Sequence, residues 1–515
     1  MKYSTSLPLL SVFASSALAT GPLEFSLRSE PHSELSRVAE RDVDGTSESA
    51  VLTNFAGQLG MKYFVNFTVG TPGQLQTAIL DTGSADTILV PSDAPFCKEK
   101  GAKCLGGTYN ASASSTFEMI TSSALDANYG ETGTDSGFVA DLATDVIQVG
   151  DVVVSGAHFG IAGQAEGNFL GDSSYAGIMG LGYSAMEAVK KGQPYYPTFV
   201  ESLVGAGAIA SRVFSLYLNE VNSYGSILFG GVDTEKYTGN LTTLNLVQAG
   251  VNGKMVQAFF MYLDEVMMKR GDGVEETIVA PNEIQEFVYP DSGASDWTVP
   301  TDVYNKVVNM TGVTVTKTNA VMACSKISNE TSFTFTLSGN GTNTAKLDIP
   351  LSSFFVPAAK TDGSIAKIGG EDACLMMIKP AASGSKFYLL GDPIIRAGYW
   401  VYDLDNGQVS IAQARLSATN SNIVAVEAGP HGILNATNQP AELSTNQTQR
   451  VAGTATASVS YSLYTATNAV GQTSGPQSTD ISSGAISLMS GIPAEGIVFL
   501  TGALLLSVVF GAFIL

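Results

Sequence analysis

Short apolar runs separated by turn-forming residues extend along most of the chain. The first of them, residues 63–69, alternates like a β-strand and stops at the turn residues 70–73. Further candidate strands are residues 145–149, 152–154, 213–218 and 227–229. Only residues 185–190 and 197–203 have a helix-like pattern. The pattern therefore predicts a body that is mainly β-sheet and ends near residue 415.

The length of the chain indicates more than one core. With 515 residues it suits two lobes plus extensions, and we expect β lobes at residues 51–247 and residues 248–415. Hydrophobic residues make up 44% of the chain and charged residues only 14%, while glycine occurs 54 times. This composition is typical of a β-rich globular protein with many turns, which agrees with the pattern of short runs.

The N-terminal segment has the features of a secretory signal. A lysine precedes a mostly apolar run, and residues 17–19 fit the small-x-small cleavage rule, so residues 1–19 are predicted to be a signal peptide. Residues 20–50 are charged and polar and include Arg37 and Arg41. We interpret them as a pro-segment, with a flexible leader as the alternative.

The composition changes again after residue 415. Residues 416–485 are rich in Ser, Thr, Ala and Asn, which predicts a disordered stalk carrying O-linked sugars. Residues 486–515 end in a long apolar run with no basic cluster after it, and small residues precede the spacer. This arrangement matches a lipid-anchor signal, with Ser483 as the attachment residue. A retained transmembrane helix is the alternative, because the apolar run is long enough to span a bilayer.

Because a secreted protein folds in an oxidising environment, we expect its four cysteines to form disulfides. Three pairings are possible, and we favour Cys97 with Cys104 and Cys324 with Cys374, because each bridge then lies within one lobe. Eight N-x-S/T sequons also fit a secreted, glycosylated surface. They are Asn66, Asn110, Asn240, Asn309, Asn329, Asn340, Asn435 and Asn446.

Charge and histidine content exclude several classes of function. The net charge of -21 argues against a nucleic-acid partner, which needs a basic surface. Only three histidines occur, and of these only His158 lies in the predicted body. A Ser-His-Asp triad and a histidine-rich metal site are therefore not expected, and the reaction considered next needs no metal or cofactor.

Two short motifs carry the candidate chemistry. Asp81 begins the sequence D-T-G-S and Asp291 begins D-S-G-A-S, and each follows an apolar run. Two such motifs could bring two carboxyl groups face to face, and we call Asp81 and Asp291 the carboxyl pair. Carboxyl groups at close range share one proton, so one can accept a proton from water while the other donates one to a substrate carbonyl. The spacing therefore predicts peptide hydrolysis.

The body, roughly residues 60–415, resembles the pepsin-like aspartic proteases. Residues 63–74 look like the first strand and turn of that family, and residues 176–182 and 389–396 resemble the segments that support its two catalytic loops. Residues 213–218 are similar to the end of the first lobe. The body, polar stalk and anchor signal together resemble the yapsin-type, surface-anchored fungal members. The resemblance implies an all-β, bilobal fold with the active-site cleft between the lobes.

The resemblance also implies roles for the motif residues. Asp81 and Asp291 would hold the nucleophilic water between them, and the hydroxyls of Thr82 and Ser292 would brace the two loops against each other.

Further roles follow for the neighbours of the carboxyl pair. Gly83 and Gly293 would let backbone N–H groups approach the carboxylates closely, and Ser84 would donate a hydrogen bond to Asp81.

The flap, the hairpin that closes over substrate, is expected at Tyr129 and Gly130. Glu131 directly follows them, and an acid at that point could pair with a basic substrate side chain. A solvated acid on a mobile hairpin is the alternative interpretation of Glu131.

Three features depart from the family pattern. The tryptophan that usually follows the first motif is missing from residues 87–90. Ala294 replaces a hydroxyl residue common beside the second aspartate, which should make Asp291 easier to protonate. Pro290 precedes Asp291, although proline cannot donate to a sheet ladder.

The leading interpretation is an aspartic endopeptidase that is secreted and held at the cell surface, on the plasma membrane or in the cell wall. Its expected partners are protein or peptide substrates and, through the lipid anchor, the membrane; the protein itself is expected to be a monomer. The alternative is a non-catalytic adhesin or peptide-binding module on the same fold.

Overall fold

The structure is a computed structural model. It describes residues 22–31, 61–98, 104, 106–129, 136–150, 152–166, 177–221, 223–248, 256–317, 319–360, 364–433, 436–437 and 463–465. The predicted signal peptide, Arg37 and Arg41, the flap residues Gly130 and Glu131, the sequons Asn435 and Asn446, and Ser483 lie outside these residues.

One long sheet runs through the described part of the chain and joins its early and late segments. Its strands, in spatial order, are β12 (Tyr237–Asn245), β27 (Gln408–Ala414), β26 (Gly398–Asp403), β9 (Val213–Tyr217), β10 (Tyr224–Phe229), β1 (Leu23–Pro31), β2 (Met61–Val69), β3 (Gln74–Asp81), β8 (Gly177–Gly180), β4 (Thr87–Leu89), β7 (Val152–Glu166), β6 (Ser136–Val149) and β5 (Glu118–Tyr129). All five strands predicted from periodicity fall within β2, β6, β7, β9 and β10, apart from one residue at the end of β9.

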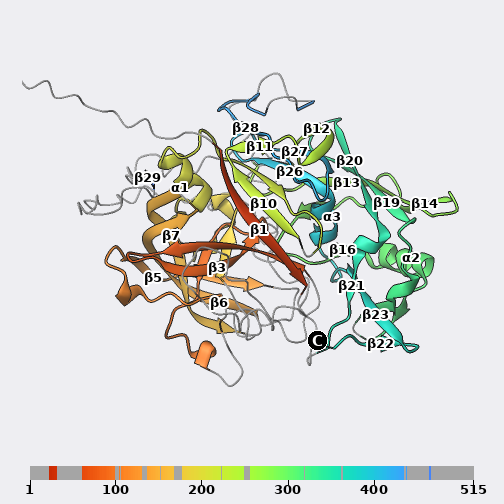
Figure 1. Cartoon of the computed structure of the whole chain (residues 1–515), viewed down its shortest axis with the longest axis horizontal. Helices are drawn as coiled ribbons and strands as arrows, with labels where there is room; N and C mark the ends of the chain where they lie inside the picture. Colours follow the sequence, from red (N-terminus) through yellow and green to blue (C-terminus); the bar gives the residue numbers. More distant parts are fainter. Residues whose placement is uncertain are drawn as a thin grey trace, which may run out of the picture.

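Smaller sheets build the later part of the body. One contains β14 (Glu275–Val279), β13 (Tyr262–Lys269), β19 (Ser332–Ser338) and β20 (Thr344–Pro350), and a second contains β15 (Phe287–Pro290), β25 (Phe387–Leu390), β16 (Trp297–Val299) and β24 (Ile378–Pro380). A third contains β17 (Thr314–Val315), β18 (Ala320–Ala323), β23 (Glu371–Met376), β21 (Phe355–Pro357) and β22 (Lys367–Ile368). Figure 1 shows the early strands, in red to yellow, on one side of β1 and the later ones, in green to cyan, on the other, so the fold is all-β and bilobal as predicted.

The described α-helices are short: α1 (Phe199–Gly205), α2 (Thr301–Thr311) and α3 (Asp392–Ala397). α1 corresponds to the helix predicted at residues 197–203. Thr198 and Glu201 form a capping box at its start, which satisfies two backbone N–H groups that the first turn leaves free.

The helix predicted at residues 185–190 is wrong. The chain makes only a 3-10 turn, Ser184–Met186, and Glu187 is already extended, with φ -66° and ψ 140°. The backbone N–H of Ala188 donates to the carboxylate of Asp86 at 2.9 Å, and the backbone N–H of Lys190 donates to the carbonyl of Ala124 at 2.8 Å. These tertiary hydrogen bonds use the groups that a helix would need, so they override the local pattern.

The ordered body extends past residue 415, where the sequence placed the start of the stalk. β28 (Ile423–Ala425) pairs with β11 (Gly231–Asp233), and Val426 and Ile433 are each 3% exposed in a cluster with Tyr399. Within the predicted stalk, β29 (Leu463–Thr465) pairs with the start of β7 at residues 152–154. The sequence pattern did not predict these strands, because they are short and lie among Ser, Thr and Asn residues.

Both predicted disulfides are present, Cys97–Cys104 and Cys324–Cys374. Each closes a loop within one lobe, so the choice among the three pairings is confirmed. Of the predicted glycosylation sites, Asn110, Asn240, Asn309, Asn329 and Asn340 are exposed. Asn66 is partly buried and accepts a hydrogen bond from the Thr77 hydroxyl at 2.6 Å. Their glycosylation stays a prediction.

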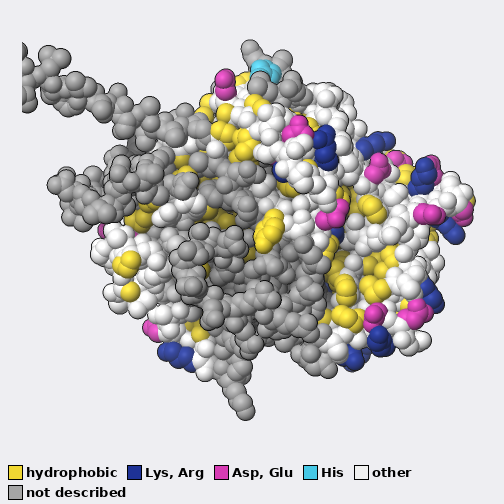
Figure 2. Space-filling view, viewed as in Figure 1, with side chains coloured by type: hydrophobic (Ala, Val, Ile, Leu, Met, Phe, Trp, Pro, Cys, Tyr) yellow, Lys and Arg dark blue, Asp and Glu magenta, His cyan; other side chains and the backbone are white. Residues whose placement is uncertain are grey.

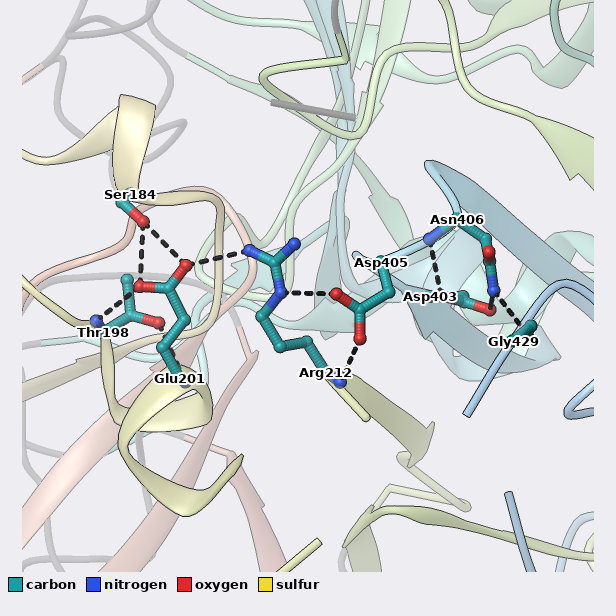
Figure 3. A network of polar contacts seen from close by, with 8 residues as sticks. All are labelled: Ser184, Thr198, Glu201, Arg212, Asp403, Asp405, Asn406 and Gly429. Atoms are coloured by element: carbon teal, nitrogen blue, oxygen red, sulfur yellow. Dashed lines mark hydrogen bonds and ion pairs between the residues drawn. The ribbon is translucent and has the colours of Figure 1, made fainter. Parts of the chain in front are cut away.

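A buried arginine ties α1 to the turn between β26 and β27 (Figure 3). Arg212 binds Glu201 through Nη1 and Asp405 through Nε, both at 2.9 Å, and its backbone N–H donates to Asp405 at the same distance. In the same view, Asp403 accepts two hydrogen bonds from Asn406. Segments nearly two hundred residues apart are thereby fixed beside the long sheet.

Asp86 and Asp403 are among the buried carboxyl groups of the body whose pKa values are raised, mainly because burial disfavours their charged forms. The pKa of Asp86 rises from 3.8 to about 6, and hydrogen bonds from Tyr196 and Ala188 limit the rise. The pKa of Asp403 rises to about 7, again opposed by hydrogen bonds from Asn406. Because the folded state binds these protons more tightly, their contribution to stability is complete in acid and is lost as the pH rises from about 4 through 7.

We expect the Asp86→Asn substitution to flatten this dependence. Asparagine keeps a side-chain carbonyl for the Ala188 N–H but cannot ionise, so the free energy of unfolding should fall less between pH 4 and pH 7. The difference between 3.8 and about 6 sets an upper limit of roughly 3 kcal/mol on the gain at pH 7. Urea unfolding at several pH values measures it, with the exposed Asp93→Asn as control. Parallel curves for the wild type and Asp86→Asn would contradict the expectation.

On the face shown in Figure 2, the described Lys and Arg side chains lie among Asp and Glu side chains rather than in one block. Among the described residues, the structure contains no helix that is both long and apolar enough to cross a membrane.

Candidate active site

The two aspartate motifs meet at the centre of the molecule through the same local construction. Asp81 is the last residue of β3, which runs parallel to β8, and Asp291 directly follows β15, which runs parallel to β25. The three residues before each aspartate, 78–80 and 288–290, are apolar and buried, so each aspartate lies at the end of a rigid element. Both aspartates are 0% exposed.

A symmetric set of hydrogen bonds holds the two loops together. The N–H of Thr82 donates to the Ser292 hydroxyl at 3.0 Å, and the N–H of Ser292 donates to the Thr82 hydroxyl at 3.0 Å. Each hydroxyl in turn donates to the opposite strand, from Thr82 to the carbonyl of Pro290 and from Ser292 to the carbonyl of Leu80, both at 2.8 Å. The geometry therefore contains the brace expected of Thr82 and Ser292.

The two glycines bring each loop against the opposite carboxyl group. The N–H of Gly83 donates to Asp81 and that of Gly293 donates to Asp291, both at 2.8 Å. A Cβ atom at Gly83 would lie 2.7 Å from the carboxyl atoms of Asp291, and one at Gly293 would lie 2.6 Å from Oδ1 of Asp81. No real side chain fits at such distances, so glycine is required at both positions.

The two carboxyl groups differ in their hydrogen bonds. The Ser84 hydroxyl donates to Oδ2 of Asp81 at 2.5 Å, whereas Oδ2 of Asp291 has no hydrogen-bond partner among the described residues. Ala294 stands at the position equivalent to Ser84 and has no hydroxyl to donate.

The pKa values follow this difference. Burial raises the pKa of Asp81, and hydrogen bonds from Ser84 and Gly83 oppose the rise. Burial, and next the charge of Asp81, raise the pKa of Asp291 well above its usual value. A proton shared by the pair is therefore held mainly by Asp291, the direction expected from Ala294.

Pro290 fits the site in spite of its missing N–H. It is the last residue of β15, and the bracing hydroxyl of Thr82 requires a carbonyl there, which proline has. The ladder resumes at the next residue, where the N–H of Asp291 donates to Leu390 at 3.1 Å. The missing N–H of Pro290 therefore leaves no required hydrogen bond of the site unmade.

Two supporting segments lie beside the motifs, as the resemblance implies. The N–H groups of Gly180 and Leu181 donate to the backbone carbonyl oxygens of Asp86 and Asp81, at 3.1 and 2.9 Å. In the other lobe, the N–H groups of Gly391 and Asp392 donate to Asp296 and Ala294, at 3.1 and 3.0 Å.

The predicted flap is described only up to its base. β5 and β6 form a hairpin in which Tyr129 pairs with Ser136, so Tyr129 ends the first arm of the hairpin. Gly130 and Glu131 follow it outside the described residues, and their roles stay predictions.

Sequence reasoning missed two side chains at this site. Tyr289 is fully buried, and its hydroxyl donates to the carbonyl of Thr82 at 2.8 Å, which adds a fifth hydrogen bond between the two motif segments. Lys62 is 4% exposed, and its ammonium group donates to the carbonyl of Gly293. Two features of the sequence could have pointed to them: a tyrosine two residues before the second motif, and a lysine at the start of a buried strand.

Comparison with known proteins agrees with this geometry. Residues 62–414 match the family model described as eukaryotic aspartyl protease. The chain is 33% identical over 402 residues to a probable aspartic-type endopeptidase OPSB of Arthroderma benhamiae, covering 76% of each chain. It is 32% identical over 356 residues to pepsin A of Sus scrofa, covering 69% of this chain and 82% of pepsin A.

A yeast relative is also similar. The aspartic proteinase yapsin-3 of Saccharomyces cerevisiae is 29% identical over 379 residues, which cover 71% of this chain and 68% of yapsin-3. The chain therefore belongs to the eukaryotic aspartyl protease family, with a pepsin-like fold, and it is an aspartic-type endopeptidase.

Proposed function

We propose that the protein hydrolyses peptide bonds with a water molecule activated between Asp81 and Asp291, while it is held at the outer cell surface. The observation that carries the mechanism is the reciprocal brace between Thr82 and Ser292, because it fixes the two loops so that each carboxyl group faces the other loop's glycine.

The unequal environments of the carboxyl pair support a division of roles. Asp81, with the hydrogen bonds from Ser84 and Gly83, keeps its charge more readily and accepts a proton from the water. Asp291 retains the shared proton and donates it to the carbonyl oxygen of the scissile bond. The water oxygen attacks the carbonyl carbon, and the tetrahedral intermediate then collapses with proton transfer to the leaving nitrogen.

The test is cleavage of a peptide library at pH values from about 3 to 6, with and without a statine-type mimic of the tetrahedral intermediate. We expect cleavage that the mimic blocks. Absence of cleavage at every pH, in material that binds the mimic, would instead favour the non-catalytic alternative. N-terminal sequencing of the active material reports whether the predicted pro-segment, residues 20–50, has been removed near Arg37 or Arg41.

The strand β1 supports a role for this leader in the uncleaved protein. Residues 23–31 lie within the predicted pro-segment, and β1 pairs with β10 on one side and β2 on the other. Removal of the leader takes a strand from the long sheet, so cleavage and rearrangement of the sheet are linked in this proposal.

The surface location rests on the predicted signals at the two ends of the chain. A chain truncated before Ser482 is expected to appear in the medium as soluble, active protease, because the described body ends well before that point. Activity assays on medium and washed cells measure the distribution, and the full-length chain is the control. Retention of the truncated protein on the cells, to the same extent as the full-length protein, would contradict the anchor.

A further inference from the structure

A buried cation lies beside the carboxyl pair. Lys62 is in β2, in the first lobe, and its side chain reaches across to the second lobe, where Nζ donates to the carbonyl oxygen of Gly293. Only 4% of the residue is exposed. A lysine is almost never buried to this extent unless its charge is compensated.

The hydrogen bond to Gly293 puts the ammonium group next to both carboxyl groups. Gly293 donates its N–H to Asp291 at 2.8 Å. The position of a Cβ on the same residue lies 2.6 Å from Oδ1 of Asp81 and 3.1 Å from Oδ1 of Asp291. Lys62 is therefore bound to the residue of the second loop that touches both members of the pair.

The charged groups around Lys62 are mostly acidic. Asp81 faces it from the end of β3, and Asp291 and Asp296 face it from the loop between β15 and β16. Lys379, on β24, is the other cation and binds Asp296 at 2.8 Å. On the neighbouring strand β1, Glu30 stands opposite Lys62 in the register. Three buried carboxyl groups thus lie near two ammonium groups.

Electrostatics at such a site favour the ionised form of the pair. The positive charge of Lys62 lowers the pKa of both Asp81 and Asp291, against the larger effect of burial. Burial lowers the pKa of Lys62 itself to about 8, and the charges of Asp291, Asp81 and Asp296 limit that fall. Lys62 is therefore charged throughout the acidic range in which the pair would work.

We propose that Lys62 is a positioning residue that keeps the carboxyl pair singly ionised in acid, and that its charge takes the place of the hydrogen bond that Ala294 cannot supply to Asp291. This inference rests on the proposed function, since it concerns the ionisation of the pair that activates the water. It assigns to this chain a third ionisable member of the site, contributed by β2.

The test compares Lys62→Met, which removes the charge, with Lys62→Arg, which keeps it. For each mature enzyme, kcat/KM on one peptide is measured across the pH range in which circular dichroism shows a folded protein. Loss of a nearby positive charge should move both limbs of the bell-shaped profile to higher pH by about one unit. On the acid side of the optimum, kcat/KM of Lys62→Met should therefore fall by up to about tenfold, whereas the limbs for Lys62→Arg should stay within a few tenths of a unit of the wild type.

The outcomes separate this inference from the proposed function. A uniform loss of kcat/KM in Lys62→Met, with both limbs unmoved, would mean a purely structural role and would overturn it. A wild type that cleaves nothing at any pH would refute the proposed function itself. If Lys62→Met does not fold, Lys62→Gln replaces it, because glutamine keeps a hydrogen-bond donor for Gly293 without the charge.

Discussion

Asn in place of either Asp81 or Asp291 is expected to abolish peptide hydrolysis while the protein remains folded. One carboxyl group cannot both accept a proton from the water and donate one to the substrate, so the shared-proton arrangement is lost. We expect kcat to fall by about four orders of magnitude, roughly 5.5 kcal/mol, as in other sites whose members act as a unit. Active-site titration and steady-state kinetics at the wild-type optimum measure the loss.

Two controls make this prediction specific. The double variant should be no slower than either single variant, because the pair works as one unit. Near pH 7 each single variant should also be at least as stable as the wild type, since burial raises the pKa of both groups and folding therefore opposes their ionisation. Turnover within tenfold of the wild type in either variant would contradict the proposed roles.

The two motifs were recognisable in the sequence because each encodes its own local structure. A buried strand followed by Asp, a hydroxyl residue and Gly specifies a tight turn, and that turn produces the bracing contacts of Thr82 and Ser292 once the lobes meet. The pairing of the cysteines was also accessible, because each bridge closes a loop within one lobe.

The missed residues depend on contacts that no local pattern contains. Lys62 and Gly293 are separated by 231 positions, and Tyr289 and Thr82 by 207. A lysine at the start of a strand is ordinarily solvated, and a tyrosine in an apolar run is ordinarily core. The polar atoms of Lys62 and Tyr289 find hydrogen-bond partners at the site only when the two lobes come together. The mistaken helix at residues 185–190 has the same origin, because its backbone N–H at Ala188 bonds to Asp86, 102 positions away.

Pro290 shows why the rule against proline in a central strand depends on which backbone group the neighbouring residues need. Proline was unexpected before Asp291 because a central strand needs N–H donors. At the end of β15, however, the required group is the carbonyl that accepts from Thr82. The objection to Pro290 therefore concerned a donor that the site does not use.

Replacement of Gly83 by Ala is expected to cause the second-largest loss of activity. The new Cβ would lie 2.7 Å from the carboxyl carbon and both carboxyl oxygens of Asp291, so that side chain must move away from Asp81. A displacement on the order of 1 Å in a catalytic group costs about 100-fold in rate, and we expect kcat to fall by 100- to 1000-fold with little change in KM.

The matched control is Gly163→Ala in β7, where a Cβ would meet no atom within 4 Å. This variant should keep the wild-type kcat and be slightly more stable, because alanine loses less backbone entropy than glycine on folding. The pH profile adds a second readout. Moving Asp291 away from Asp81 weakens the charge repulsion that helps raise the pKa of Asp291, so the alkaline limb of Gly83→Ala should move to lower pH. If Gly83→Ala kept kcat within threefold of the wild type, the two carboxyl groups could not be held against the glycines as the structure places them.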